Sequence, residues 1–439
     1  MHGFSVSIRT SLLSLTVLTL ILLSVSQQPL AQTTGSVSPY SRYGIGDLRY
    51  GGFAENTGMG GLGLASGSTR SINTLNPASY SSVDITTFST GVSSNFTTMS
   101  TSDTSVLRNN TSLTSLAFAF PVSPGWGTSI GLLPVSSVGY RVSSEEVTDN
   151  IGKTKYLYEG AGGLNTLYAG AAWKMLSGFS AGFNMSYVFG EIMKRRSVEI
   201  PDSANIFNTR ITNRISAGGL LFNAGVQYTI PLAGEWSITT GIVASLPGKI
   251  SCSSDTLTER YMNKTGSAGN VIGVIKDTIP ELVPGNNSGS MTMPQYTGAG
   301  IVFRKGMRWV FGADAVTQNW SSFSFFGQHD DLSNSMHLST GCQFTPGGPD
   351  DKKLLNTIHY RAGFHYEKTY LQLKGLRLND YGFSLGAGIP LRKIGAVINI
   401  AVETGRRGTL GSGLIMERYT RVVAGFTFND KWFDSKKFN

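Results

Sequence analysis

The sequence has few charged residues and few cysteines for its length. Of 439 residues, 14% are charged, and Cys252 and Cys342 are the two cysteines. Past the N-terminal region there is no run of 18 apolar residues, so we expect no membrane-spanning helix. The strands predicted below place the two cysteines near opposite ends of a sheet. We therefore expect both to be unpaired.

Motifs of several common function classes are also missing. The sequence contains no phosphate-binding loop and no metal-ligand cluster. His359 and His365 lie six residues apart on one predicted strand face, or ~20 Å, which is too far to share a metal ion. The net charge of +9 is dispersed, without a basic helix or an RNA-type aromatic motif. We predict no enzyme, no cofactor, no metal and no nucleic-acid partner, and a basic surface that contacts anionic lipid heads and lipopolysaccharide.

The sequence does contain a strict alternation of bulky apolar residues with small or polar ones. Successive side chains of a strand point to opposite faces, so residues 179–189 predict a strand with one apolar face. In a membrane barrel that face meets lipid, whereas in a soluble sandwich it is core. The residues expected to face lipid are Phe179, Ala181, Phe183, Met185, Tyr187 and Phe189, and those expected to face inward are Ser180, Gly182, Asn184, Ser186 and Gly190.

The N-terminus has the pattern of a secretory signal. Arg9 precedes an apolar run from Leu12 to Val25, which is too short to span a membrane, and cleavage after Ala31 is plausible. We predict a signal peptide at 1–31, an N-terminal hatch at 32–85, a β-barrel at 86–430 and a periplasmic tail at 431–439.

The rhythm of the predicted strands favours a barrel. The fold class expected is all-β, a transmembrane antiparallel β-barrel of about fourteen strands with an N-terminal plug in the lumen. Short connections are expected at 124–126, 176–178, 232–235 and 304–306. Extended ones are expected over 99–112, 143–163, 195–210 and 254–292. Short periplasmic turns and long external loops have this asymmetry, although Pro346 to Asn356 is long for a periplasmic turn. Closure removes unpaired edges, each group of which costs several kcal/mol in lipid.

One predicted strand places polar side chains toward the lumen. Its lipid face would hold Ile358, Tyr360, Ala362, Phe364 and Tyr366, and its inner face His359, Arg361, Gly363, His365 and Glu367. Arg361 with His359 or His365 is the best candidate for binding a carboxylate. The alternative is that Arg361 pairs with Glu367, Glu403 or the hatch.

Residues 32–85 are rich in Gly, Ser and Asn but contain enough apolar residues to pack inside a lumen. A flexible periplasmic tail is the alternative. The run from Gly58 to Ala65, followed by Asn76, Pro77 and Ala78 and a strand near Thr86, resembles the hatch of the FadL/TodX family of outer-membrane transporters for hydrophobic compounds. The C-terminal segments from Gly405 to Thr409 and from Phe426 to Phe433 are similar to those of Bacteroidota members of that family.

The resemblance implies a monomeric fourteen-stranded barrel in the outer membrane, with both termini periplasmic, inserted by the barrel-assembly machinery. It implies that a long-chain fatty-acid-like compound enters from outside and leaves sideways through a kink in the third strand. Pro134 lies in that strand here and cannot donate to the ladder, so it either opens the wall or marks a bulge or strand end. The alternative function is a PorV-like type IX secretion shuttle or a surface barrel that binds proteins.

Overall fold

The structure is a computed structural model. It describes residues 35–50, 52–148, 152–201, 206–265, 271–279, 287–348 and 351–431. Residues 34–439 form one compact unit. The predicted signal peptide and nearly all of the predicted C-terminal tail lie outside the described residues.

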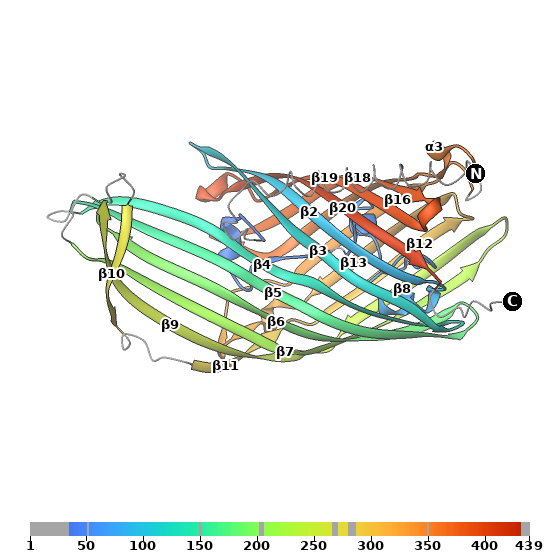
Figure 1. The fold of residues 1–439 in the computed structure, drawn as a ribbon, viewed down its shortest axis with the longest axis horizontal. Coiled ribbons are helices and arrows are strands. Elements are labelled where there is room, and N and C mark those ends of the chain that lie inside the picture. Colours follow the sequence, from blue (N-terminus) through green and yellow to red (C-terminus); the bar gives the residue numbers. More distant parts are fainter. Residues whose placement is uncertain are drawn as a thin grey trace, which may run out of the picture. The chain divides into compact units, whose positions relative to one another are not determined.

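The chain forms an all-β antiparallel barrel of fourteen strands, as predicted (Figure 1). The first strand pairs with the last, from Thr86↔Asp430 to Ser100↔Met416, and this pairing closes the barrel. Two of the fourteen are broken in the middle, so the barrel strands are β2 (Thr86–Ser100), β3 (Ser105–Ser123), β4 (Trp126–Thr148), β5 (Gly152–Leu176), β6 (Phe179–Glu199), β7 (Asn208–Pro231), β8 with β9 (Trp236–Ser245, Gly248–Thr265), β11 with β12 (Asn287–Met293, Tyr296–Lys305), β13 (Trp309–Gln318), β16 (Ser335–Phe344), β17 (His359–Leu373), β18 (Leu376–Leu391), β19 (Ala396–Arg407) and β20 (Met416–Asp430).

The remaining elements are short. Before the barrel come η1 (Pro39–Arg42), β1 (Asp47–Leu48), α2 (Ala54–Thr57) and η2 (Pro77–Ser82). Within the connections lie β10 (Val271–Ile279), η3 (Trp320–Ser322), β14 (Ser324–Phe325), β15 (Gln328–His329), α3 (Leu354–Thr357), η4 (Arg392–Ile394) and η5 (Gly411–Gly413). Among the residues described, no helix is both long enough and apolar enough to cross a membrane.

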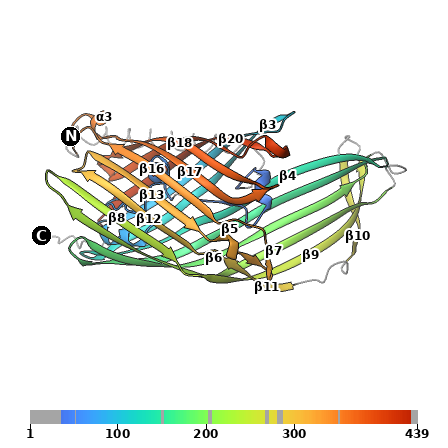
Figure 2. The same cartoon turned by 180° about the vertical axis from the view of Figure 1, so that it is seen from behind.

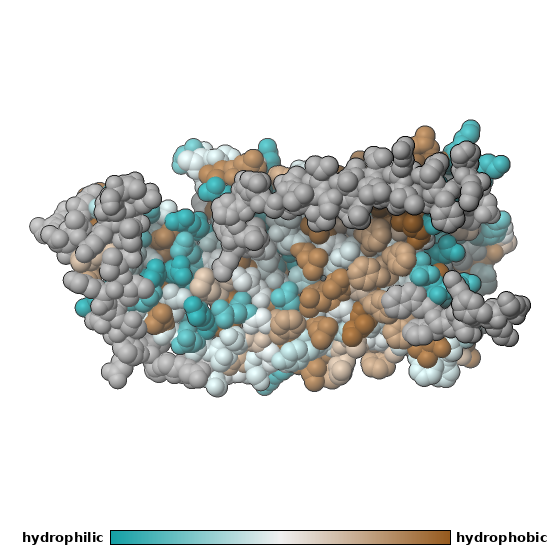
Figure 3. All heavy atoms as spheres, in the orientation of Figure 1, coloured by the Kyte–Doolittle hydropathy of each residue, from teal (hydrophilic) through white to brown (hydrophobic). Residues whose placement is uncertain are grey.

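The predicted alternation of faces is present in β6. Phe183, Met185 and Tyr187 are exposed on the outer side, whereas Ser180 and Asn184 are buried on the inner side. The other strands share this pattern, and in Figure 3 apolar residues gather over one part of the wall, with hydrophilic ones toward the end where β10 lies. An exposed apolar band around a closed barrel is the surface that a bilayer requires. Both cysteines are free, as expected.

The predicted short turns are present at one rim, whereas most of the extended connections predicted at the other rim are shorter than expected. The rim where β2 begins and β20 ends, here called the hatch-side rim, has the four short turns expected from the sequence. At the far rim, the extended connections predicted at 99–112 and 143–163 are wrong, because strands fill most of both segments. Segment 254–292 likewise holds the end of β9, β10 and most of β11. Beyond the lipid band the strands continue to pair through their backbones, but their side chains are polar on both faces. A prediction based on the alternation of apolar residues therefore misses these strand ends.

The wall is taller on one side. Strands β4, β5, β6, β7 and β9 run on toward the far rim, and β10 pairs with β9 at that end (Figure 2). The half of β7 nearer the far rim pairs with β9, and the half nearer the hatch-side rim pairs with β8. The far mouth is therefore bounded by a high sheet on one side and by shorter strands on the other.

Candidate functional site

The segment before the barrel packs inside the lumen against a belt of glycines on the wall. A Cβ atom added at Gly127 would lie 1.9 Å from the carbonyl oxygen of Tyr80, and one at Gly363 would lie 2.1 Å from the nitrogen of Gly60. A Cβ atom added at seven further wall glycines would come within 2.1–3.0 Å of residues 52–85, the part of the predicted hatch to which the name hatch is restricted from here on. The glycines involved are Gly127, Gly182, Gly225, Gly241, Gly300, Gly341, Gly363, Gly386 and Gly425. Only residues without a side chain allow two backbones to approach so closely.

The Asn-Pro-Ala element of the hatch meets the wall between β7 and β8. Asn76 caps η2 by accepting a hydrogen bond from the Ala78 nitrogen, at 3.0 Å. Its Nδ2 atom donates to the Leu64 carbonyl at 2.8 Å and lies 3.2 Å from the Val226 carbonyl. Asn76 is fully buried, so this one side chain closes the turn and attaches the hatch to the barrel.

A carboxylate on β13 holds the middle of the hatch. The Oδ2 atom of Asp314 accepts hydrogen bonds from the backbone nitrogens of Gly63 and Leu64, at 2.6 and 2.8 Å. Three strands along the wall, on β18, Ser384 accepts a hydrogen bond from the nitrogen of Gly60 at 2.9 Å. These contacts supply acceptors for backbone N–H groups of the hatch that lie outside any helix or strand.

The wall is interrupted between β3 and β4. The two strands pair from Ser123↔Trp126 up to Leu116↔Leu132, and no further pairing between them occurs in the described residues. Beyond that point β3 pairs with β2, and β4 pairs with β5 across a bulge between Pro134 and Ser136. Pro134 therefore lies two residues past the last pair, at the start of a lateral gap. Its backbone lacks the N–H group that a continuing ladder would use.

Residues 35–50, here called the strap, bridge this gap. β1 pairs with the edge of β4, Asp47↔Ser137 and Leu48↔Ser136. On the opposite edge, Asn110 of β3 donates to the Gly35 carbonyl at 2.8 Å, and Arg49 contacts Ser112 at 3.1 Å. Burial lowers the pKa of Arg49 to about 10, so this guanidinium stays charged at neutral pH.

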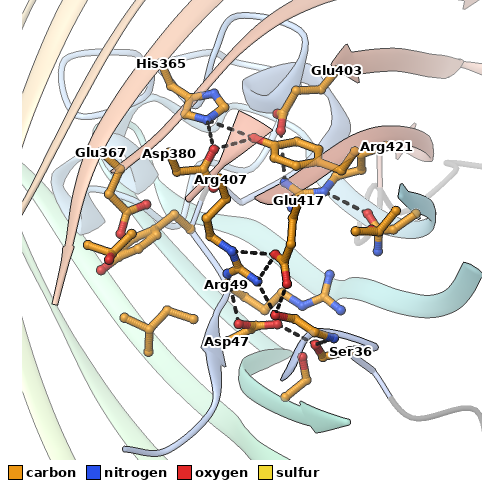
Figure 4. Close-up of a pocket in the computed structure, with 18 of the residues that line it drawn as sticks. Ser36, Asp47, Arg49, His365, Glu367, Asp380, Glu403, Arg407, Glu417 and Arg421 are labelled. Atoms are coloured by element: carbon orange, nitrogen blue, oxygen red, sulfur yellow. Dashed lines mark hydrogen bonds and ion pairs between the residues drawn. The ribbon is translucent and has the colours of Figure 1, made fainter. Parts of the chain in front are cut away.

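An ion-pair network attaches the strap to the barrel beside a cavity of about 160 Å³ (Figure 4). Arg407 of β19 lies 2.9 Å from Asp47 and 2.6 Å from Glu417 of β20. Ser38 of the strap donates to Glu417 at 2.5 Å, and Ser36 donates to Asp47. The charges are buried but paired, the condition under which such groups are tolerated. Charged and polar residues make up most of the lining of this cavity, here called the polar cavity.

The four lumen residues predicted from the sequence do not form one site. Arg361 is buried and donates to Asn399 and Gln343 at 2.7 and 2.8 Å, with Glu55 of the hatch at 3.8 Å. His359 contacts Thr345 instead, at 2.8 Å. Of the alternatives considered for Arg361, the structure therefore has the hatch as its ionic partner.

The other two predicted residues line the polar cavity. His365 contacts Asp380 at 3.5 Å and Tyr419 at 3.2 Å, and Glu367 lies 3.6 Å from His337. Each has partners from the wall itself. Among the described residues, no group of three or more His, Cys, Asp or Glu side chains could hold a metal ion.

An apolar cluster connects the far mouth to the gap. It includes Leu164, Val188 and Ile192 of the tall wall, with Leu48 of the strap and Val135 of β4 packed against it. Tyr43, Leu332 and Leu373 also pack against it, and these residues line a second cavity of about 360 Å³. Arg42, Lys194, Asp330 and Asp331 line the same cavity. The arrangement places charged groups at the entrance and apolar side chains along the way to the break in the wall.

A family model covers nearly the whole chain. The model of the BamG family matches residues 13–439. The chain belongs to the BamG family. No curated protein matches.

Solved structures with similar folds are FadL-type barrels. A FadL homologue from Pseudomonas aeruginosa superposes with a TM-score of 0.59 at 13% identity, over 88% of this chain and 99% of that one. The toluene transporters TodX of Pseudomonas putida, at 15% identity, and TbuX of Ralstonia pickettii, at 13%, both give 0.55. They match over 87% and 86% of this chain and 98% of each of theirs. At such identities the likeness establishes the fold, which is that of FadL-type outer-membrane barrels.

Neither the strap nor its ion-pair network could be predicted from the sequence. Asp47 and Arg407 are separated by 360 positions and belong to segments with no shared local pattern. A weak signal exists in β19, where Glu403 and Arg407 have the same strand parity and so point to the same side. Asp47 follows Gly44 and Gly46, whose positive φ angles turn the backbone just before β1.

Proposed function

We propose that this protein moves hydrophobic, fatty-acid-like compounds from the cell exterior into the outer membrane through the gap between β3 and β4. The break in an otherwise closed barrel is the observation that carries this proposal. A compound insoluble in water gains ~25 cal/mol for each Å² of apolar surface it buries, first in the apolar cluster and then in lipid. The hatch-side rim would face the periplasm.

The proposed path runs from the cavity at the far mouth, along the apolar cluster, to Leu48 and Val135. Arg42 and Lys194 at the entrance can contact a carboxylate head group. The strap crosses the gap, so release requires it to move. Its contacts with the two edges of the gap are few hydrogen bonds and a two-residue strand, so opening must break these and the ion pair of Asp47 with Arg407.

Replacing Pro134 with alanine should lower transport without lowering barrel stability. Alanine restores a backbone donor and lets β4 straighten toward β3, which narrows the gap. Initial uptake of a labelled long-chain fatty acid should fall about five- to tenfold, a change worth ~1 to 1.4 kcal/mol. Heat-induced unfolding on gels should be unchanged.

Pro390, near the end of β18, is the matched control. It pairs in an intact part of the wall, with Val397 of β19, so Pro390→Ala should leave uptake unchanged. Equal uptake by Pro134→Ala and the native protein would mean that the proline marks only a bulge.

A second function is favoured by the family name and by the same gap. BamG denotes a family whose name points to barrel assembly. The edges of β3 and β4, which β1 covers only at Ser136 and Ser137, could pair with another strand. A barrel that binds proteins, whether for barrel assembly or as a PorV-like shuttle, would use these edges instead of a lipid path. Its loss would disturb other surface proteins and leave fatty-acid uptake intact.

A further inference from the structure

Three neighbouring turns at the hatch-side rim combine exposed cations with exposed apolar side chains. They are the β12–β13 turn, the β16–β17 loop with α3, and the β18–β19 turn with η4. The cations are Arg308, Lys352, Lys353, Arg392 and Lys393, and the apolar side chains are Met307, Leu354, Leu355 and Ile394. We call these nine residues the basic collar.

The turns of the collar are neighbours at one rim, because the strands that they join pair in order, β13 with β16 and β17 with β18. The nitrogen of Thr345 donates to the Arg308 carbonyl at 2.8 Å, which joins the first turn to the loop. Arg392 is close enough to Asp351 to lower the pKa of that carboxyl, after the larger effects of hydrogen bonds from Lys353 and Asn356. The five cations have no ion pair within 4 Å among the described residues. Their charge is therefore available to a partner.

Hydrogen bonds hold the described part of the loop that contains α3. Asn356 donates to Asp351 at 2.8 Å, and its carbonyl accepts from the nitrogen of Gly347 at 2.6 Å. These contacts leave the side chains of Leu354 and Leu355 57% and 68% exposed. Exposed leucines on a segment held by hydrogen bonds indicate a surface that something else covers.

The outer wall indicates what covers them. Tyr360 lies on the exposed face of β17, and its hydroxyl donates to the Leu355 carbonyl at 3.2 Å. This places α3 outside the wall, next to the aromatic pair Trp309 and Phe344, whose rings lie 4.2 Å apart. Aromatic residues of this kind mark the interface of a bilayer, and Figure 1 shows α3 at the end where β20 finishes.

We propose that the basic collar is a binding site for anionic phospholipids. The leucines, Met307 and Ile394 would enter the edge of the hydrocarbon, and the lysines and arginines would meet the head groups. Each cation near an anionic surface contributes about a fivefold preference. With the orientation proposed above, this leaflet is the inner one. The site is independent of any transport through the barrel.

The depth of α3 is the first test. In a Cys252→Ser and Cys342→Ser background, the full chain with Leu355→Cys is labelled with bimane and placed in phosphatidylcholine vesicles containing phosphatidylglycerol. A doxyl quencher near the lipid head group should quench this label about threefold or more above a label at Asp103→Cys in the β2–β3 loop. Equal quenching at the two positions would overturn the proposal.

Charge is the second test. We expect the preference for phosphatidylglycerol over phosphatidylcholine to fall at least about fivefold in a Lys352→Gln, Lys353→Gln, Arg392→Gln, Lys393→Gln variant. Lys368→Gln with Arg418→Gln, exposed cations elsewhere on the wall, is the matched control and should keep it. An unchanged preference contradicts the proposal. If the four substitutions instead abolish binding of lipopolysaccharide alone, or if the Leu355 label is shielded in cells but not in vesicles, the occupant is lipopolysaccharide or a protein and the proposal fails.

Discussion

Substituting Gly363 with valine should unseat the hatch and turn a closed barrel into an open pore. A Cβ atom at this position would lie 2.1 Å from the nitrogen of Gly60 and 2.2 Å from the carbonyl carbon of Met59. Both contacts are with backbone, so no side-chain rotation relieves them. Overpacking of this kind costs about 1–3 kcal/mol, which corresponds to an increase in hatch opening of roughly five- to 150-fold.

Ion conductance across planar bilayers measures this effect. The native protein should show rare openings, and Gly363→Val should show frequent ones of large conductance. Gly348→Val is the control, because no atom lies within 4 Å of a Cβ added there. If Gly363→Val conducts no more than the control, the hatch does not depend on the glycine belt for its seat.

A disulfide between the strap and β4 should stop transport. The Cβ position at Gly35 lies 2.9 Å from the Cβ atom of Ser137, so cysteines at both positions need only a small shift to reach the usual ~3.8 Å. Oxidation would fix the strap across the gap. In a chain with Cys252→Ser and Cys342→Ser, fatty-acid uptake should fall by at least about tenfold, since a covalent bond removes the opening motion.

Reduction with dithiothreitol should restore uptake in the same sample. The matched control is Ala54→Cys with Gly425→Cys, where the added Cβ position lies 3.0 Å from the Ala54 Cβ atom. That bond ties the hatch to β20 away from the gap and should leave uptake unchanged. Equal uptake by the oxidised and reduced Gly35→Cys, Ser137→Cys protein would exclude strap movement as the release step.

The barrel could be predicted from the sequence because each strand shows its two faces locally. All fourteen strands of the wall correspond to predicted ones, and Phe183 with Asn184 shows why: neighbours on opposite faces differ in both size and polarity. The ends of β4 and β5 could not be predicted, because beyond the lipid band both faces are polar and pairing is set by the neighbouring strand.

Pro134 was the sequence feature that indicated the gap, and it left a simple bulge as the alternative. Whether β3 and β4 pair beyond Leu116 depends on contacts between segments, above all the strap on the edge of β4. The partner of Arg361 was also a matter of three-dimensional contact, since Glu55 lies more than three hundred positions away. Local patterns specify faces and turns, whereas a site built between distant segments needs the folded chain.

Fatty-acid uptake by cells lacking this protein is the most direct test of the proposed function. We expect initial uptake of a labelled long-chain fatty acid to fall at least about tenfold, which corresponds to ~1.4 kcal/mol in the free energy of permeation. Uptake should return with the native gene but not with the oxidised strap variant. Normal uptake, together with depletion of other outer-membrane barrels or stalled surface secretion, would contradict the transport role and favour the protein-binding one.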